Sequence, residues 1–146
     1  MGRVPEVNRS VTDNLDRVAR SHAMRQVRSR NTTPELTVRQ ILRELGFGGY
    51  RVHRRDLPGK PDVVWMGKRR ALFVHGCFWH GHRCKRGRRM PATNRAYWSA
   101  KILRNRTRDA KARAALRKNG WDVIVIWECE LRRPDRLESR LQQGLG

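Results

Sequence analysis

The chain has 146 residues, a length typical of a single domain with one hydrophobic core. Lysine and arginine number 34 against 13 acidic residues, which gives a formal net charge of +21 at pH 7. A charge of this size favours a polyanionic partner, and no apolar run reaches the length of a membrane span. A merely solvated basic surface is the weaker explanation, because arginine dominates the positive charge and its planar fork suits phosphate. Without a secretion signal, we expect a cytoplasmic, nucleoid-associated protein.

The N-terminal third contains a polar segment followed by one clear helix. Residues 1–20 have little apolar periodicity, so we predict a flexible basic arm there and a single domain over residues 21–146. The stretch NTTPEL predicts a helix start, with Thr32 or Thr33 as N-cap, Pro34 in the first turn and Glu35 at a favourable acidic position. Apolar residues then recur at helical spacing up to Gly46: Val38, Ile41, Leu42 and Leu45.

The rest of the chain alternates predicted strands and helices. Residues 50–53 form a predicted strand, and residues 62–66 and 70–75 a predicted hairpin with its turn at Gly67 and Lys68. Residues 94–118 predict one long helix, and residues 134–143 a last one. The nearly continuous apolar run WDVIVIWE, residues 121–128, predicts a central strand covered on both faces. This order indicates an α/β domain with a mixed central sheet flanked by helices in layers.

The segment HGCFWHGHRC, residues 75–84, concentrates histidine and cysteine next to large aromatic rings. Together with a distant cysteine it forms the pattern C-x4-H-x-C-x44-C, made by Cys77, His82, Cys84 and Cys129. Such a Cys3His set fits tetrahedral zinc. The alternative is three buried thiols that never meet, since buried free cysteine is common and the spacing differs from that of standard zinc fingers.

A second candidate site lies in PGKPD and the strand that follows. Asp62 would begin a strand, with another functional position on the adjacent strand, which is the layout of PD-(D/E)-x-K nucleases. The alternative is that Asp62 is an ordinary turn or strand-end residue. The usual acid-x-lysine is absent, because Phe73, Val74 and His75 occupy that place.

Five segments, in order from Met24 to Leu131, together resemble the very-short-patch (Vsr) mismatch repair endonucleases: MRQVRSRNTTPEL, LPGKPDVV, FVHGCFWHGHRC, PATNRAYW and GWDVIVIWECEL. The resemblance implies a divergent PD-(D/E)-x-K branch with a restriction-endonuclease-like fold and a zinc-stapled loop. It also implies an enzyme that nicks duplex DNA 5′ of the thymine in T:G mismatches. Such mismatches arise when 5-methylcytosine deaminates, and the nick would start very-short-patch repair.

The resemblance also implies roles for individual residues. Asp62 would bind Mg²⁺ directly, Val74 would bind it through its main-chain carbonyl, and Glu35 would act through ordered water. His80 is the expected general base, and His75 sits where the usual lysine would help at the phosphate.

The resemblance assigns the metal-binding loop two further tasks. Cys77, His82, Cys84 and Cys129 would hold a structural Zn²⁺, because four protein ligands leave no open position for water. Phe78 and Trp79 would project as a wedge and, joined by Trp98, would insert into the base stack beside the mismatch. The other three tryptophans are expected in the core because they lie in apolar strands: Trp65, Trp121 and Trp127. His22 and His53 are expected to have no role in the site.

Three other functions remain open from the sequence. A non-catalytic zinc-containing DNA- or RNA-binding module would explain charge, zinc and aromatics, but it would not need the set Asp62, Glu35, His75 and His80. A nuclease with His80 and Asn94 in a histidine–metal site lacks a convincing ββα-metal pattern. A related nuclease recruited to another lesion or to restriction is the most realistic competitor. The expected partners are double-stranded DNA with a T:G mismatch and mismatch-repair proteins, and we expect a monomer without membrane association.

Overall fold

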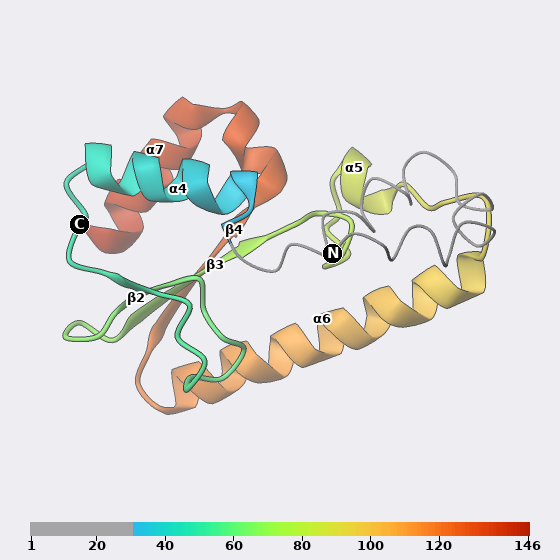
Figure 1. Cartoon of the computed structure of the whole chain (residues 1–146), viewed down its shortest axis with the longest axis horizontal. Coiled ribbons are helices and arrows are strands. Elements are labelled where there is room, and N and C mark those ends of the chain that lie inside the picture. The colour runs from blue at the N-terminus through green and yellow to red at the C-terminus, as the bar shows by residue number, and fades with distance from the viewer. Residues whose placement is uncertain (1–30) are drawn as a thin grey trace, which may run out of the picture.

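The computed structural model describes residues 31–146, and its centre is a four-stranded mixed β-sheet (Figure 1). The strands lie in the order β1 (Arg51–Val52), β2 (Val63–Trp65), β3 (Arg70–His75) and β4 (Asp122–Trp127). Strand β2 is antiparallel to both β1 and β3, whereas β3 and β4 run parallel. The predicted hairpin is therefore confirmed as β2 and β3.

The predicted central position of the last strand is wrong, because β4 is an edge strand of the sheet formed by residues 31–146. Its side chains alternate between two hydrophobic clusters, with Ile124 and Ile126 on one face and Val123 and Val125 on the other. A continuous apolar run indicates that both faces of a strand are covered, and helices do cover both faces of this edge strand. The sequence pattern therefore could not distinguish an edge strand from a central one.

The turn between β2 and β3 is wider than predicted. It covers residues 66–69, where the Met66 carbonyl accepts a hydrogen bond from the Arg69 N–H at 3.2 Å and Arg69 has a φ of +53°. Strand β2 is correspondingly short, and Asp62 lies just before it. The Asp62 N–H still donates to the Leu72 carbonyl at 3.0 Å, so the neighbouring strand holds this residue in place.

The three long helices follow the predictions. Helix α4 (Thr33–Glu44) is capped by Thr32, whose side chain accepts a hydrogen bond from the Glu35 N–H. Helices α6 (Arg95–Lys118) and α7 (Pro134–Leu145) correspond to the other two. Two short elements were not predicted, namely α5 (Lys85–Arg88) within the Cys/His loop and the 3₁₀ helix η1 (Glu128–Arg132).

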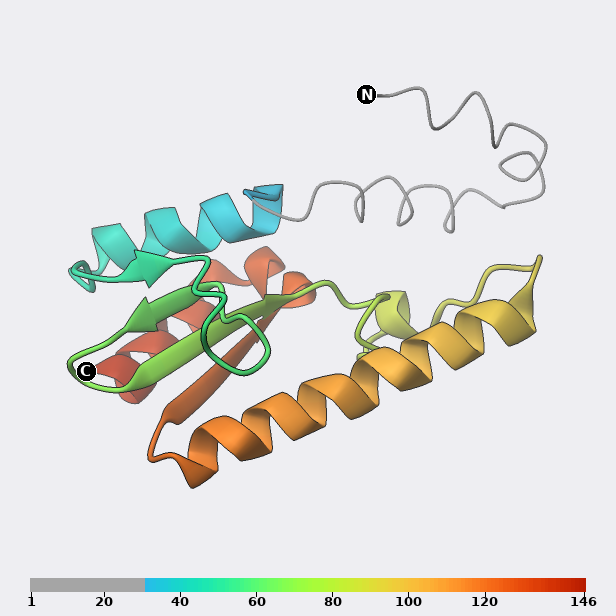
Figure 2. The same cartoon turned by 60° about the horizontal axis from the view of Figure 1, so that its bottom comes forward.

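The helices cover both faces of the sheet. Helices α4 and α7 lie together on one face, and α6 runs along the other (Figures 1 and 2). The larger core cluster joins α4 and α7 to the sheet through ten buried side chains: Val38, Ile41, Leu42, Val63, Trp65, Leu72, Ile126, Leu137, Leu141 and Leu145. On the opposite face Ala71 and Phe73 pack with Leu116 of α6, and Trp121 is partly buried beside them. The predicted layered, mixed α/β arrangement is confirmed, and Trp65 and Trp121 pack in these two clusters as predicted.

Helix α6 extends past the end of the sheet and contacts the loop after β3 (Figure 2). Its buried residues recur at spacings of three, four and seven, which place them on a single face of the helix. They contact different neighbours along its length. Leu116 packs on the sheet, whereas Trp98 and Ile102 pack on the loop residues Phe78 and Trp79. This one helix therefore positions the Cys/His loop relative to the sheet.

Two expectations concern regions that the structure does not describe or test. The predicted arm, residues 1–20, and His22 lie outside the described residues. The assignment of residues 21–146 to a single domain stays a prediction. None of the helices between residues 31 and 146 is long and apolar enough to cross a membrane.

Candidate active site and metal centre

A pair of carboxyl groups meets where α4 begins and β2 starts. Glu35 in the first turn of α4 is buried, and its Oε1 accepts a hydrogen bond from the Asn31 N–H at 2.9 Å. Asp62 accepts a hydrogen bond from the Val74 N–H at 2.6 Å through its Oδ2. Burial raises the pKa of Asp62 to about 7, with a further contribution from the charge and hydrogen bond of Glu35. Neither the Val74 N–H nor the charge of Arg39 cancels this effect.

The arrangement around Asp62 suits a hard divalent cation. Two carboxyl groups whose mutual repulsion helps to raise a pKa are stabilised when a cation lies between them. Carboxylate and main-chain carbonyl oxygens are the ligands that Mg²⁺ prefers, and Asp62, Glu35 and the backbone of Val74 supply both kinds. The structure thus brings together three residues predicted for the magnesium site, and their ligation of an ion stays a prediction.

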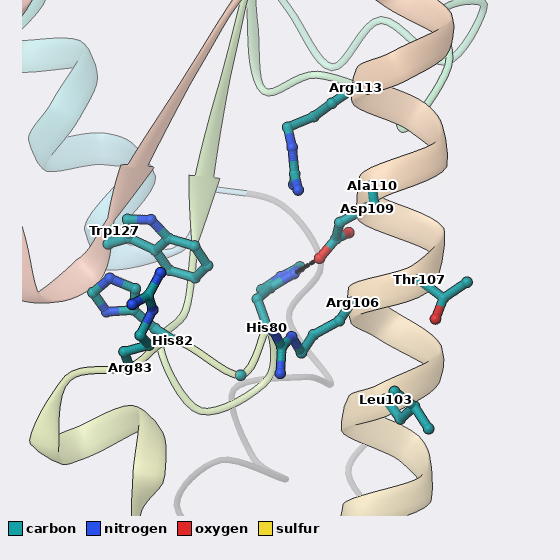
Figure 3. A pocket seen from close by; sticks show the side chains of 11 residues that line it. His80, His82, Arg83, Leu103, Arg106, Thr107, Asp109, Ala110, Arg113 and Trp127 are labelled. Carbon is teal, nitrogen blue, oxygen red and sulfur yellow. Dashed lines mark hydrogen bonds and ion pairs between the residues drawn. The ribbon is translucent and has the colours of Figure 1, made fainter.

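Two histidines and an aspartate form a second cluster at the end of β3. The rings of His75 and His80 are stacked, with centroids 3.8 Å apart and planes inclined by 3°. The Nδ1 of His80 lies 2.5 Å from Oδ2 of Asp109, which α6 contributes (Figure 3). Burial raises the pKa of Asp109, but the hydrogen bond and charge of His80 outweigh burial and leave the pKa below its ordinary value. An ionised carboxylate only accepts hydrogen bonds, so Nδ1 carries the proton.

His75 lies behind His80 in a buried position. Its side chain is 5% exposed, and among residues 31–146 its Nδ1 has no hydrogen-bond partner. Burial lowers the pKa of His75 to about 3, and the nearby charges of His80 and Arg113 lower it further against the opposing effect of Asp109. The ring is therefore neutral near pH 7 and lacks the positive charge that a lysine in this place would carry. Its stacking favours a role in orienting His80.

Asp109 was missed in the sequence analysis, although two signals could have found it. It is the only acidic residue in the 24 residues of α6, which otherwise carries many arginines and lysines. It also continues the helical spacing of the buried face, which runs through Trp98, Ile102, Asn105, Ala112 and Leu116. A single acid on the inward face of a basic helix indicates a specific partner.

The predicted Cys3His set is assembled. The ligand atoms of Cys77, His82, Cys84 and Cys129 all lie within 4.8 Å of one another. Cys77 and His82 belong to the loop after β3, Cys84 caps α5, and Cys129 lies in η1. The alternative of three thiols that never meet is excluded. Three thiols and one imidazole are the donor types of structural zinc sites, so this set fits a zinc ion whose identity stays a prediction.

The cluster is oriented by contacts outside the four donors. The His82 ring stacks on Trp127, with centroids 4.1 Å apart, and its Nδ1 lies 3.6 Å from the Cys129 Sγ. Burial raises the pKa values of Cys77 and Cys129. Burial by itself would raise the pKa of Cys84 as well. The Gly87 N–H, 3.2 Å from its Sγ, helps to bring that pKa below its ordinary value. Trp127, predicted in the core, is partly buried and forms one wall of the metal centre.

The predicted wedge residues do not project. Phe78, Trp79 and Trp98 are 0%, 9% and 5% exposed, and they pack edge to face with centroids 5.4–5.7 Å apart. The Asn105 side-chain amide donates to the Trp79 carbonyl at 2.9 Å, which ties this cluster to α6. The expectation of exposed rings is wrong because α6 supplies apolar partners that a short loop lacks. Insertion into DNA stays a prediction, and it requires these rings to leave their cluster.

An open, basic pocket lies directly beside the histidines. It has a volume of about 680 Å³ and lies between the Cys/His loop and α6 (Figure 3). His80, Asp109 and Trp127 contribute to its walls together with three arginines: Arg83, Arg106 and Arg113. Because positive side chains surround it, the pocket suits a phosphate group.

A carboxyl pair that suits a divalent cation, a histidine–aspartate pair and a basic pocket are groups that a metal-dependent nuclease can use. A sequence model of the family described as "DNA mismatch endonuclease Vsr" matches residues 12–86. The type II nicking enzyme V.XorIIP of Xanthomonas oryzae pv. oryzae is 50% identical over 135 residues, which cover 92% of this chain and 98% of that protein. The DNA mismatch endonuclease Vsr of Escherichia coli is 38% identical over 127 residues, covering 87% and 80%. The chain therefore belongs to the Vsr DNA mismatch endonuclease family, as the resemblance predicted.

Another relative agrees with this assignment. The type II nicking enzyme V.NmeAIP of Neisseria meningitidis serogroup A is 40% identical over 133 residues, which cover 91% of this chain and 94% of that protein. The names of all three relatives describe DNA-cleaving enzymes. The comparisons therefore support a nuclease that acts on DNA over a non-catalytic binding module.

Proposed function

We propose that this protein is a magnesium-dependent endonuclease that nicks duplex DNA on the 5′ side of the thymine in a T:G mismatch. The observation that carries the proposal is the position of two successive residues at the end of β3. Val74 contacts Asp62 through its N–H, and His75 stacks on His80. One strand end thus connects the carboxyl pair to the histidine–aspartate pair, which are the two groups that hydrolysis of a phosphodiester needs.

Asp62, the Val74 carbonyl and, through ordered water, Glu35 would hold the magnesium ion. When bound, the ion would stabilise negative charge on the phosphate. His80 would act as the base, because Asp109 holds its Nδ1–H and leaves Nε2 free to accept a proton. The nucleophile would be a water molecule next to Nε2. As His80 takes a proton from this water, the water oxygen would bond to phosphorus and the P–O bond to the leaving ester oxygen would break. The leaving oxygen then takes up a proton from solvent.

The Cys3His cluster would hold a structural zinc ion. With all four positions filled by protein ligands, no site remains for a reacting water. The ion would join the loop to η1, through Cys129, and so hold His80 at a constant distance from β3. Zinc in this proposal supports the geometry of the site and takes no part in proton transfer.

Mismatch selection would come from the cluster of Phe78, Trp79 and Trp98. Opening a base step costs a few kcal/mol of stacking, and a poorly stacked mismatch costs less than a normal pair. Because the rings are buried together in this structure, insertion would exchange contacts among the rings for contacts with bases. Mismatch-repair proteins would be further partners, and the protein would act as a monomer.

The test is cleavage of end-labelled duplexes that carry T:G, C:G or T:A at one defined position, with varied flanking bases. We expect a nick only in the T:G duplex, in the thymine strand, and only with magnesium present. Equal nicking of the matched duplexes would contradict mismatch selection. Nicking at another lesion would favour the competing function, a related nuclease with a different target.

A further inference from the structure

We propose that Arg113 contacts a non-bridging oxygen of the phosphate that is cleaved and supplies positive charge to it during the reaction. The inference rests on the proposed function only in requiring a DNA-cleaving enzyme, since phosphate is present at every base step. It assigns a substrate-contacting role to a residue of α6 that the sequence analysis did not select.

The position of Arg113 supports this role. It lies one helical turn after Asp109 on α6 and lines the same pocket as His80 and Asp109. Figure 3 shows its guanidinium directed from the helix into the space beside the His80–Asp109 pair. The residue is partly buried, so the charged group is held near the pocket. A cation in this place can reach a phosphate on which His80 acts.

The guanidinium of Arg113 is available for a ligand. Within residues 31–146 it makes no hydrogen bond or ion pair with another side chain. Asp109 is the nearest acid along the helix, but its Oδ2 faces His80 at 2.5 Å. As far as the described part of the chain is concerned, the N–H donors of this guanidinium are therefore free for a phosphate, and its planar fork can bind two oxygens at once.

His75 is not placed to do the same task. Its ring is 5% exposed, is stacked behind His80 and is not among the residues that line the pocket. Charge develops on the phosphate oxygens as the water attacks, and a cation aimed at those oxygens stabilises that charge. Among the pocket arginines, Arg83 and Arg106 are exposed, whereas Arg113 is partly buried next to the reacting groups. Arg113 is therefore the arginine that can act on the transition state.

The first experiment measures single-turnover nicking and duplex affinity of Arg113→Gln and Arg113→Lys. Arg104→Gln is the matched control, because it removes one charge from the opposite, exposed face of α6. We expect Arg113→Gln to slow nicking about 100-fold with less than about a 10-fold change in Kd, because the contact is strongest in the transition state. The nicking rate of Arg113→Lys should lie between those of Arg113→Gln and wild type, and the rate of Arg104→Gln should stay within about twofold of wild type.

The second experiment separates contact with the phosphate from a structural role. Arg113→Ala is assayed with and without added guanidinium ions, alongside thermal unfolding. We expect an unchanged unfolding temperature and a rate that rises at least about 10-fold with guanidinium, since the freed pocket can bind the ion near the phosphate. A variant that nicks within twofold of wild type, or one that unfolds and gains nothing from guanidinium, overturns the inference.

The two proposals fail in different ways. If the wild-type enzyme prefers another mismatch or site, mismatch specificity is wrong, and the Arg113 comparison is run on that preferred duplex. If wild type nicks T:G duplexes and Arg113→Gln nicks them equally well, only the role of Arg113 is wrong. Equal rate losses in Arg113→Gln and Arg104→Gln would also overturn it, because a general charge effect would then explain both.

Discussion

Asp109 and His80 come from α6 and from the loop after β3, and their side chains meet at 2.5 Å. The contact fixes which imidazole nitrogen is free, because the ionised carboxylate accepts the hydrogen of Nδ1 and leaves Nε2 for a substrate water. The long basic helix therefore does more than cover the sheet. It orients the residue that we propose as the general base.

Removal of the Asp109 carboxylate should impair nicking without unfolding the protein. Asp109→Asn can still contact His80 but stabilises the protonated imidazole less, so we expect single-turnover nicking to fall about 100-fold, and His80→Ala to lose at least as much. Binding of mismatched duplex should persist, since phosphate contacts supply most of the affinity. The exposed Asp122→Asn is the control and should nick normally. An Asp109→Asn enzyme with the wild-type rate would show that the pair is not catalytic.

Asp62→Asn should abolish nicking and stabilise the metal-free protein at alkaline pH. The pKa of Asp62 is raised to about 7, so between pH 4 and pH 7 the folded state keeps a proton that the unfolded chain has lost. That contribution to the free energy of unfolding decreases as pH rises through this window. Asparagine avoids the loss, and we expect a gain of roughly 2 kcal/mol at pH 8 that vanishes near pH 4.

The measurement for Asp62→Asn is urea unfolding of both proteins in EDTA, so that no ion occupies the carboxyl pair. Glu138→Gln, which removes a carboxyl group from α7, is the control for the loss of one negative charge. A variant that is less stable than wild type at pH 8 would show that Asp62 is not destabilised by ionisation in the folded protein.

The purified protein should contain one zinc ion per chain. His82→Asn and Cys129→Ser remove ligands from a cluster that joins the loop to η1, so both should lose zinc and unfold at lower temperature. His53→Asn is the matched control, because His53 is a partly buried histidine outside the cluster and its positive φ suits asparagine. Elemental analysis and thermal unfolding measure both effects. A folded wild-type protein without zinc would refute the assignment.

The aromatic cluster should control the preference for T:G over a normal pair. Trp79→Leu and Trp98→Leu keep an apolar side chain but remove the large ring. We expect the mismatch preference to fall about 10-fold, because no ring then replaces the stacking that the opened base step loses. Both residues are buried, and each change should also cost about 2–3 kcal/mol of stability.

The control for the aromatic cluster is Trp65→Leu, since Trp65 is buried in the core on the other face of the sheet. It should lose similar stability and keep the full mismatch preference. The measurement is competition between mismatched and matched duplexes at fixed salt, below the unfolding temperature of each variant. Full preference in Trp79→Leu and Trp98→Leu would mean that the rings only pack.

Local patterns were sufficient for much of this protein. The Thr32 cap, the helical spacing from Val38 and the β2–β3 hairpin depend on residues close together in the chain, and each was predictable. The metal-binding set was also recognisable, because Cys77, His82 and Cys84 concentrate metal-binding side chains in one short segment, even though Cys129 lies far away in the chain. Family membership followed from the same short motifs.

Contacts between distant segments were not predictable from those patterns. The edge position of β4, the burial of Phe78 and Trp79, and the pairing of His80 with Asp109 all depend on where α6 lies relative to the sheet and the loop. Periodicity specifies which face of an element is covered, but it does not specify which neighbour covers it. That choice results from packing among segments separated by dozens of residues. The sequence could therefore supply the candidate catalytic histidine, whereas the folded arrangement supplied its partner.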